Sequence, residues 1–331
     1  MTGVLLSTGF VARFGDRLAA TLASVGREPD IIHLPDEPNV ALDPATCDRI
    51  KIAYLSRDLR FSRLYEAFGA AVTAASHLEW VHFASAGIDQ HPFLAALRER
   101  GVRLTTSSGT NAEPVAQTAI TGLLMLARRF PHWMQAQRRH AWEPLRGPAL
   151  PPDLRGQTIL IVGMGAIGGA VARFCRTIGM HVIGMRRTPL QPGDPADEVL
   201  PISALRGVLP RCQWVVLACP LTEETRRLLN AETLVLLPRG AQIVNVARGG
   251  CIDERALIEA LRNGHIGGAY LDVFETEPLP AASPLWDMPG VIVSPHSAAV
   301  SAGNERRAAD IFMENIVHWA HNEPLRNRRD A

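Results

Sequence analysis

Short apolar runs alternate with helix-like stretches in the first third of the chain. The apolar runs cover residues 4–6, 31–34, 50–55, 80–83 and 102–104. The helix-like stretches between them include residues 14–25, 64–76 and 92–100. This alternation predicts βα units, in which each strand is followed by a helix.

The middle of the chain changes pattern. Apolar side chains recur every three or four residues between 111 and 141, which predicts one helix longer than a typical globular helix, able to bridge two domains. Residues 143–156 then contain four prolines. Proline removes a backbone donor, so this stretch forms neither a continuous helix nor a central strand, and we expect a linker or surface arm.

A second βα alternation begins at Thr158. Its apolar runs cover residues 158–163, 181–185, 214–219, 241–247, 267–274 and 291–296. Runs that are almost continuously apolar are typical of parallel strands whose sheet is covered on both faces. After them, residues 303–321 carry an apolar stripe that predicts one amphipathic helix.

Length and composition narrow the function. The 331 residues suffice for two domains, and the net charge of +1 gives no basic field for nucleic acid or an acidic membrane, so we expect a small-molecule partner. Lys51 is the single lysine beside 33 arginines. A Schiff-base enzyme, a lysine nucleophile and a phosphate-loop NTPase each need a positioned lysine, and these classes are set aside.

The five cysteines are odd in number and widely spaced, without a C-x-x-C or Cys/His pattern. They predict reduced, buried thiols rather than a disulfide framework, and no metal site. The first ten residues lack a basic segment, and no apolar run approaches about 18 residues. We therefore expect a soluble, cytoplasmic protein.

A glycine-rich turn follows the strand at 158–162. Residues 163–168 read GMGAIG, and a helical pattern and a second strand complete a βαβ frame. In the dinucleotide-binding fingerprint, Gly163 makes the tight turn, Gly165 lets the backbone approach a pyrophosphate, and Gly168 allows close helix–strand packing. A ligand-free turn and a methyltransferase glycine loop are the alternatives.

The end of the second strand indicates which dinucleotide binds. An acidic residue there accepts the ribose hydroxyls of NAD, whereas arginine accommodates the 2′-phosphate of NADP. Arg186 and Arg187 stand at this position, and no carboxylate follows until Asp194. The pattern predicts that NADP(H) is preferred and that NAD(H) is possible; two arginines that are merely solvated are the alternative.

Polar residues follow three apolar runs of the second alternation, where open α/β sheets bind their ligands. These residues are Arg248, Asp272 with Glu275 and Glu277, and His296. Together they could hold an anionic substrate and transfer a proton. Taken singly, each is an ordinary surface cation, loop charge or one of eleven histidines.

At this point the sequence resembles the D-isomer-specific 2-hydroxyacid dehydrogenase family, which includes glyoxylate/hydroxypyruvate reductases. The resemblance runs through residues 84–89, 111–128, 154–173, 220–230, 243–257, 268–280 and 283–298. It implies an α/β fold of two doubly wound parallel-sheet domains, with a Rossmann cofactor domain inserted into a flavodoxin-like substrate domain. We expect residues 1–104 and 297–331 in the substrate domain and 105–296 in the cofactor domain.

The resemblance also implies roles for single residues. Arg248 would bind the substrate carboxylate and carbonyl oxygen, His296 would be the acid–base group, and Glu277 would hold its imidazole. Backbone N–H groups of Ala86 and Gly87 would also bind the carboxylate. The positions expected to line the cofactor site, besides the three glycines and two arginines, are Ala166, Ile167, Cys219, Pro220, Val246 and Asp272, the last holding the nicotinamide amide.

The expected function is hydride transfer between NADP(H) and a small 2-oxo or 2-hydroxy acid. Glyoxylate, hydroxypyruvate and related 2-oxo acids are the expected substrates. The long apolar helix, with Trp133 and Trp142 in the arm, predicts a homodimer. The alternative is a nucleotide-sensing regulator of the corepressor type that the family also resembles.

Overall fold

The apolar runs form two separate parallel sheets in the computed structural model, which describes residues 1–37, 40–60, 62–88 and 91–329. The chain divides into two units. Unit 1 comprises residues 1–110 and 301–331, and unit 2 comprises residues 111–300. The divisions fall a few residues after the predicted positions 104 and 296.

Unit 1 contains a five-stranded parallel sheet in the order β2-β1-β3-β4-β5. This is the flavodoxin-like order, as expected. The strands are β1 Thr2–Leu6, β2 Pro29–His33, β3 Ile50–Leu55, β4 Trp80–Phe83 and β5 Arg103–Thr106. The helices are α1 Thr8–Ser24, α2 Pro44–Arg49, α3 Arg57–Arg60, α4 Tyr65–Ala74, α5 Leu94–Glu99 and α12 Asn304–Ala320.

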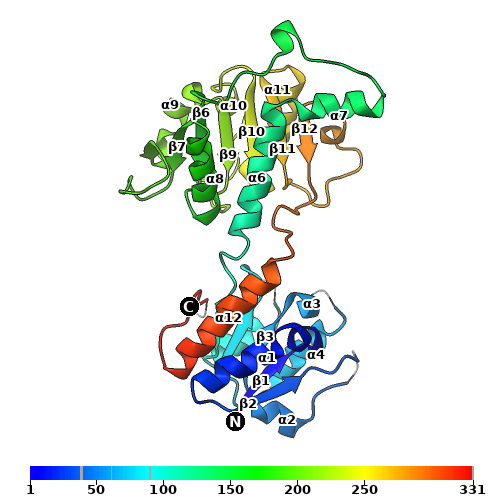
Figure 1. Ribbon diagram of the computed structural model, residues 1–331, viewed down its shortest axis with the longest axis vertical. Helices are drawn as coiled ribbons and strands as arrows, with labels where there is room; N and C mark the ends of the chain where they lie inside the picture. The colour runs from blue at the N-terminus through cyan, green and yellow to red at the C-terminus, as the bar shows by residue number, and fades with distance from the viewer. Residues whose placement is uncertain (38–39, 61, 89–90, 330–331) are drawn as a thin grey trace. The chain divides into compact units, whose positions relative to one another are not determined.

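Helices cover both faces of this sheet. One apolar cluster joins the sheet to α4 and α5 through Phe68 and Leu97, and another joins it to α1 and α12 through Leu18 and Phe312. Figure 1 shows α12 beside α1, and Arg17 forms an ion pair with Asp310 at 2.6 Å between them. The C-terminal helix predicted at 303–321 therefore completes the core of unit 1.

Unit 2 contains a seven-stranded parallel sheet in the order β12-β11-β10-β9-β6-β7-β8. The strand order reverses between β6 and β9, which is the Rossmann arrangement with an added edge strand. The strands are β6 Thr158–Val162, β7 His181–Met185, β8 Glu198–Leu200, β9 Trp214–Leu217, β10 Ala241–Asn245, β11 Ile266–Leu271 and β12 Val291–Val293. The helices are α6 Ala112–Ala127, α7 Phe130–Arg138, α8 Ala166–Thr177, α9 Leu205–Val208, α10 Ala231–Leu234 and α11 Glu254–Arg262.

Two apolar clusters cover the faces of the second sheet. Helices α6 and α8 pack on one face, where the backbone of Gly122 approaches Tyr270 so closely that an added Cβ would lie 2.3 Å from the ring. Helices α9, α10 and α11 pack on the other face. All five cysteines are buried and form no disulfide, as the sequence predicted.

The single helix predicted over 111–141 is wrong. The structure has two helices, α6 and α7, and Arg129 lies between them with a left-handed φ of 59°. Apolar spacing continues across the break, but a left-handed residue ends the helical hydrogen-bond ladder. The short edge strand β8 was also missed, since three partly buried residues give little periodic signal.

In the part of the chain that the structure describes, no helix is both long enough and apolar enough to cross a membrane.

Candidate active site

The glycine-rich turn joins β6 to α8. Gly163 has a φ of +96°, and a Cβ there would lie 2.6 Å from the carbonyl oxygen of Ala218. Gly165 has open space around the position of a Cβ, whereas a Cβ on Gly168 would lie 1.9 Å from the carbonyl oxygen of Gly163. The backbone N–H groups at the start of α8 thus stand beside an open glycine, which fits a bound pyrophosphate.

Other predicted cofactor residues surround this turn. Ala166 and Ile167 begin α8, and Val246 follows β10. Cys219 and Pro220 follow β9, and the Cα of Cys219 would lie 2.8 Å from a Cβ on Gly163. These residues come from three neighbouring strands whose carboxyl ends meet at the strand-order reversal, where doubly wound sheets bind ligands.

The guanidinium of Arg186, at the end of β7, is engaged by neighbouring groups of its own loop. It donates to Asp194 Oδ1 at 2.8 Å and to the carbonyl oxygens of Thr188 and Pro189. The hydrogen bond from Arg186 holds the pKa of Asp194 below its ordinary value. Asp194 is the next carboxylate along the chain, and the loop returns it to Arg186, a contact that the sequence did not predict. Arg187 is exposed.

Arg248 follows β10 and is held by a buried asparagine. Asn245 is 1% exposed; its amide nitrogen donates to the Arg248 carbonyl, and its amide oxygen accepts from the Ala247 N–H. Arg248 itself is exposed and directly precedes a short 3-10 helix, Gly249–Cys251. Asn245 was not predicted as a site residue, although a polar side chain inside an apolar strand was a signal in the sequence.

Asp272 connects β11 to the segment that carries His296. It is 3% exposed, and its carboxylate accepts hydrogen bonds from Ser294 Oγ at 2.5 Å and from the backbone N–H groups of Ser297 and Ala298. This cage fixes the loop on both sides of His296. The nicotinamide contact predicted for Asp272 stays a prediction.

His296 has strained backbone geometry. Its φ is +50°, a region that costs about 1–3 kcal/mol for a residue with a side chain. Its N–H donates to the carbonyl oxygens of Asp272 at 2.8 Å and Ser294 at 3.0 Å. These bonds hold the strained conformation and direct the imidazole toward Glu277.

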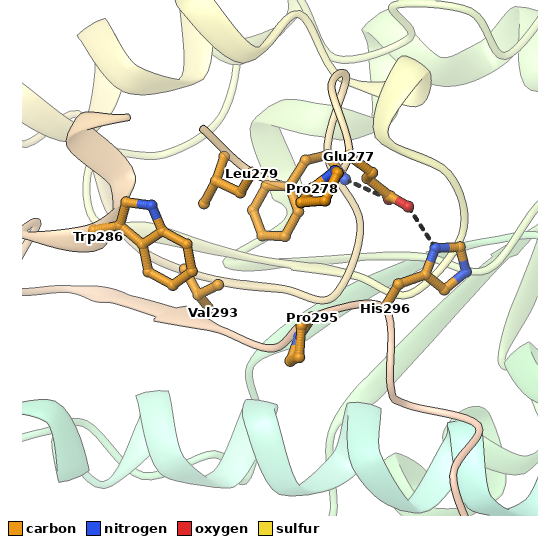
Figure 2. A pocket seen from close by; sticks show the side chains of 8 residues that line it. Glu277, Pro278, Leu279, Trp286, Val293, Pro295 and His296 are labelled. Carbon is orange, nitrogen blue, oxygen red and sulfur yellow. Dashed lines mark hydrogen bonds and ion pairs between the residues drawn. The ribbon is translucent and has the colours of Figure 1, made fainter. Parts of the chain in front are cut away.

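The imidazole and the carboxylate face each other (Figure 2). His296 Nδ1 lies 2.7 Å from Glu277 Oε2, and Glu277 Oε1 accepts from the Phe274 N–H at 3.0 Å. Burial raises the pKa of Glu277, but the hydrogen bonds from His296 and Phe274 outweigh it, and the net pKa is lowered. An ionised Glu277 can only accept, so Nδ1 carries the proton of this bond.

Two hollows adjoin this pair. The first has a volume of about 390 Å³ and mainly apolar walls, formed by Phe274, Pro278, Leu279, Trp286, Val293 and Pro295 (Figure 2). The second has a volume of about 600 Å³ and is lined by Arg248, Glu277 and His296 together. The structure thus brings the three predicted catalytic residues to one hollow.

Ala86 and Gly87 belong to unit 1. They lie on an exposed turn directly after β4, where Ser85 Oγ donates to the Gly87 carbonyl oxygen at 2.9 Å. Asp89, at the end of the segment 84–89 that carries part of the resemblance, lies outside the described residues.

The buried thiols of Cys219, which follows β9, and Cys251, three residues after Arg248, form a hydrogen-bonded pair. The hydrogen bond from the Cys219 thiol lowers the pKa of Cys251, against burial that raises it. The same bond and burial raise the pKa of Cys219. Cys251 was not singled out by sequence, because widely spaced cysteines do not reveal that two strand ends bring them together.

The Rossmann-type sheet and its glycine turn define unit 2 as a dinucleotide-binding unit. Residues 120–298 match the family model described as D-isomer specific 2-hydroxyacid dehydrogenase, NAD binding domain. The chain belongs to this family, and it is a pyridine-nucleotide-dependent oxidoreductase.

Three similar proteins illustrate the relationship. An (S)-sulfolactate dehydrogenase from Chromohalobacter salexigens is 37% identical over 67% of this chain and 71% of that one. A glyoxylate reductase from Korarchaeum cryptofilum is 36% identical over 68% of each chain. The crystal structure of a D-isomer specific 2-hydroxyacid dehydrogenase from Xanthobacter autotrophicus Py2, in complex with NADPH and MES, is 32% identical, with a TM-score of 0.72 over 99% of this chain and 97% of that one.

The close approach at Gly168 generates a stability prediction. We expect Gly168→Ala to lower the free energy of unfolding by about 1–3 kcal/mol, because its methyl group meets the backbone of Gly163. Urea denaturation measures this. Gly207→Ala in α9 is the control, since a Cβ there meets nothing within 4 Å and alanine favours a helix. Equal stability of the two variants would contradict the packing argument.

Proposed function

We propose that this enzyme reduces a small 2-oxo acid to the D-2-hydroxy acid with NADPH. Arg248 binds the substrate carboxylate, His296 donates a proton to the carbonyl oxygen, and Glu277 orients the imidazole. The observation that carries this proposal is the 2.7 Å hydrogen bond between His296 and Glu277 in the hollow that Arg248 also lines. The glyoxylate reductase relative supports the substrate class.

The proton transfer follows from the geometry. Glu277 accepts from Nδ1, so Nε2 is the nitrogen that faces the substrate, and the negative charge of Glu277 stabilises the protonated imidazole. Arg248 offers a planar fork that pairs with a carboxylate through two hydrogen bonds and places the carbonyl group beside His296. A nicotinamide cofactor bound at the glycine turn would supply the hydride for the carbonyl carbon, and His296 Nε2 would donate the proton of the new hydroxyl group.

Unit 2 carries the groups on which this proposal rests. Gly163, Gly165 and Gly168 would hold the pyrophosphate, and Arg248, Glu277 and His296 belong to the same unit. The role of Ala86 and Gly87 in binding the substrate carboxylate stays a prediction from the resemblance.

The choice of NADPH over NADH rests on the end of β7. Arg186 and Arg187 stand where an acidic residue would accept the ribose hydroxyls of NAD. Asp194 offsets the charge of Arg186 but also fixes its guanidinium in place, while Arg187 remains exposed. The NADPH complex of the Xanthobacter relative supports this choice.

Substitution at His296 tests the catalytic role. We expect His296→Ala to lower kcat by about 10²- to 10⁴-fold, with NADPH binding retained, because only the proton donor is removed. Arg248→Ala should raise KM and lower kcat together, because it binds the substrate in the ground and transition states. Steady-state kinetics with hydroxypyruvate measure both. If His296→Ala kept the wild-type kcat under conditions in which the chemical step limits the rate, His296 would not be the proton donor.

The companion variant Glu277→Gln keeps the shape and removes the charge. Because Glu277 has a lowered pKa, it is ionised throughout the neutral range in the wild-type enzyme. Glu277→Gln removes the negative charge that stabilises the protonated form of the neighbouring imidazole. The alkaline limb of the reductive pH–rate profile should therefore move to lower pH. An unchanged profile would refute this role of Glu277.

Cofactor preference is measured by the ratio of kcat/KM for NADPH and NADH. We expect at least a tenfold preference for NADPH, since each charge-assisted phosphate contact contributes about 1.5–3 kcal/mol. Arg186→Asp should shift the ratio toward NADH. Equal values for the two cofactors in the wild-type enzyme would overturn the proposal.

We also expect a homodimer. Large apolar side chains are exposed on α7 and in the arm that follows it: Phe130, Trp133, Met134 and Trp142, the last 96% exposed. Exposed apolar surface of this kind marks a protein–protein contact, and a second copy of the chain would cover it. Light scattering at micromolar concentration should give twice the 36.0 kDa mass of the chain. A particle of 36.0 kDa would count against it.

A further inference from the structure

The two hollows beside His296 have different chemistry. The walls of the first are apolar apart from His296 and Glu277 (Figure 2). The second contains Arg248, which binds the substrate carboxylate in the proposed function. A substrate held by Arg248 and protonated by His296 would therefore occupy the second hollow, where the other wall residues would contact the rest of the substrate.

Two further guanidinium groups line the second hollow. Arg226 and Arg227 belong to the loop between β9 and α10, and they share the hollow with Arg248. Its volume of about 600 Å³ lies well within the range of about 300–1,000 Å³ that is usual for ligand sites. There is room for a substrate group beyond the carboxylate and the carbonyl.

The backbone of Arg227 is tied to the Arg248 turn. Arg227 has a left-handed φ of 46°, and its N–H donates to the carbonyl oxygen of Gly250 at 2.8 Å. A left-handed φ is unfavourable for an arginine, and strained residues of this kind cluster at ligand sites. This hydrogen bond anchors Arg227 to Gly250, which is two residues after Arg248 along the chain.

Positive charge exceeds negative charge in this hollow. Three arginines face Glu275 and Glu277, and Glu277 is engaged by His296. Glu275 Oε1 lies 3.7 Å from Arg227 Nε, and Arg226 Nε lies 3.9 Å from Glu223, whose side chain is 93% exposed. An ion pair as exposed and as long as Arg226–Glu223 contributes little, so Arg226 is available for another anion.

We propose that Arg226 and Arg227 bind a second anionic group of the substrate. The substrates of this enzyme are then 2-oxo acids that carry a sulfonate, a phosphate ester or a second carboxylate. Planar guanidinium groups pair with each of these groups through parallel hydrogen bonds, while Arg248 binds the 2-oxo acid carboxylate. This inference rests on the proposed function and names its substrate class.

The test compares doubly charged with singly charged substrates. We expect kcat/KM for sulfopyruvate, 3-phosphohydroxypyruvate or oxaloacetate to exceed that for hydroxypyruvate at least tenfold at constant low ionic strength. Which of the three is best identifies the anion. The preference should decrease with added NaCl, because salt screens exposed charges.

Two variants locate the preference. Arg226→Gln and Arg227→Gly should each lower the ratio of kcat/KM between the best doubly charged substrate and hydroxypyruvate at least tenfold, mainly through KM. Glycine adopts a left-handed φ without strain, so Arg227→Gly removes the guanidinium without threatening the fold. Arg262→Gln is the matched control: this arginine on α11 also lies 3.9 Å from a glutamate, Glu259, but lines neither hollow, and the ratio should not change.

Each other outcome is decisive. A wild-type enzyme that prefers hydroxypyruvate, or variants that lower kcat/KM equally for both kinds of substrate, would overturn this inference and leave the proposed function intact. Failure to reduce these four 2-oxo acids and glyoxylate would overturn both.

Discussion

The site depends on one buried carboxylate. Asp272 stands at the end of β11, and it accepts from the backbone and the serine hydroxyl of the segment that follows β12. Hydrogen bonds to a buried charge contribute about 1.5–3 kcal/mol each, and leaving that charge unpaired would cost more than this. The segment can therefore take only a path that completes the cage, and this path gives His296 its left-handed backbone and its contact with Glu277.

The same principle applies at the Arg248 turn. Asn245 uses both ends of its buried amide to hold the backbone on either side of Arg248, while the guanidinium itself is exposed. In both places a buried polar group fixes the backbone beneath an exposed polar side chain. A rigid backbone of this kind matters because a catalytic side chain that is misplaced by about 1 Å lowers the reaction rate.

The roles open to individual arginines depend on which charged groups lie next to them in the structure. Arg186 looked like an isolated cation in the sequence, but Asp194 and two carbonyl oxygens surround its guanidinium. Nothing in the sequence distinguishes Arg226 and Arg227 among 33 arginines, yet both line the hollow of Arg248. In each case the separation along the sequence concealed which groups share a small volume.

The sequence by itself determined the local structure of this protein. Strand positions, the glycine turn at 163–168 and the polar residues after β10, β11 and β12 follow from periodicity and from the small set of residues that such turns accept. Only the tertiary structure decided the break at Arg129, the pairing of Asp194 with Arg186, and the shared hollow of Arg226, Arg227 and Arg248. Periodicity records which face of an element is buried, whereas these contacts depend on how loops far apart in the sequence return to the same edge of a sheet.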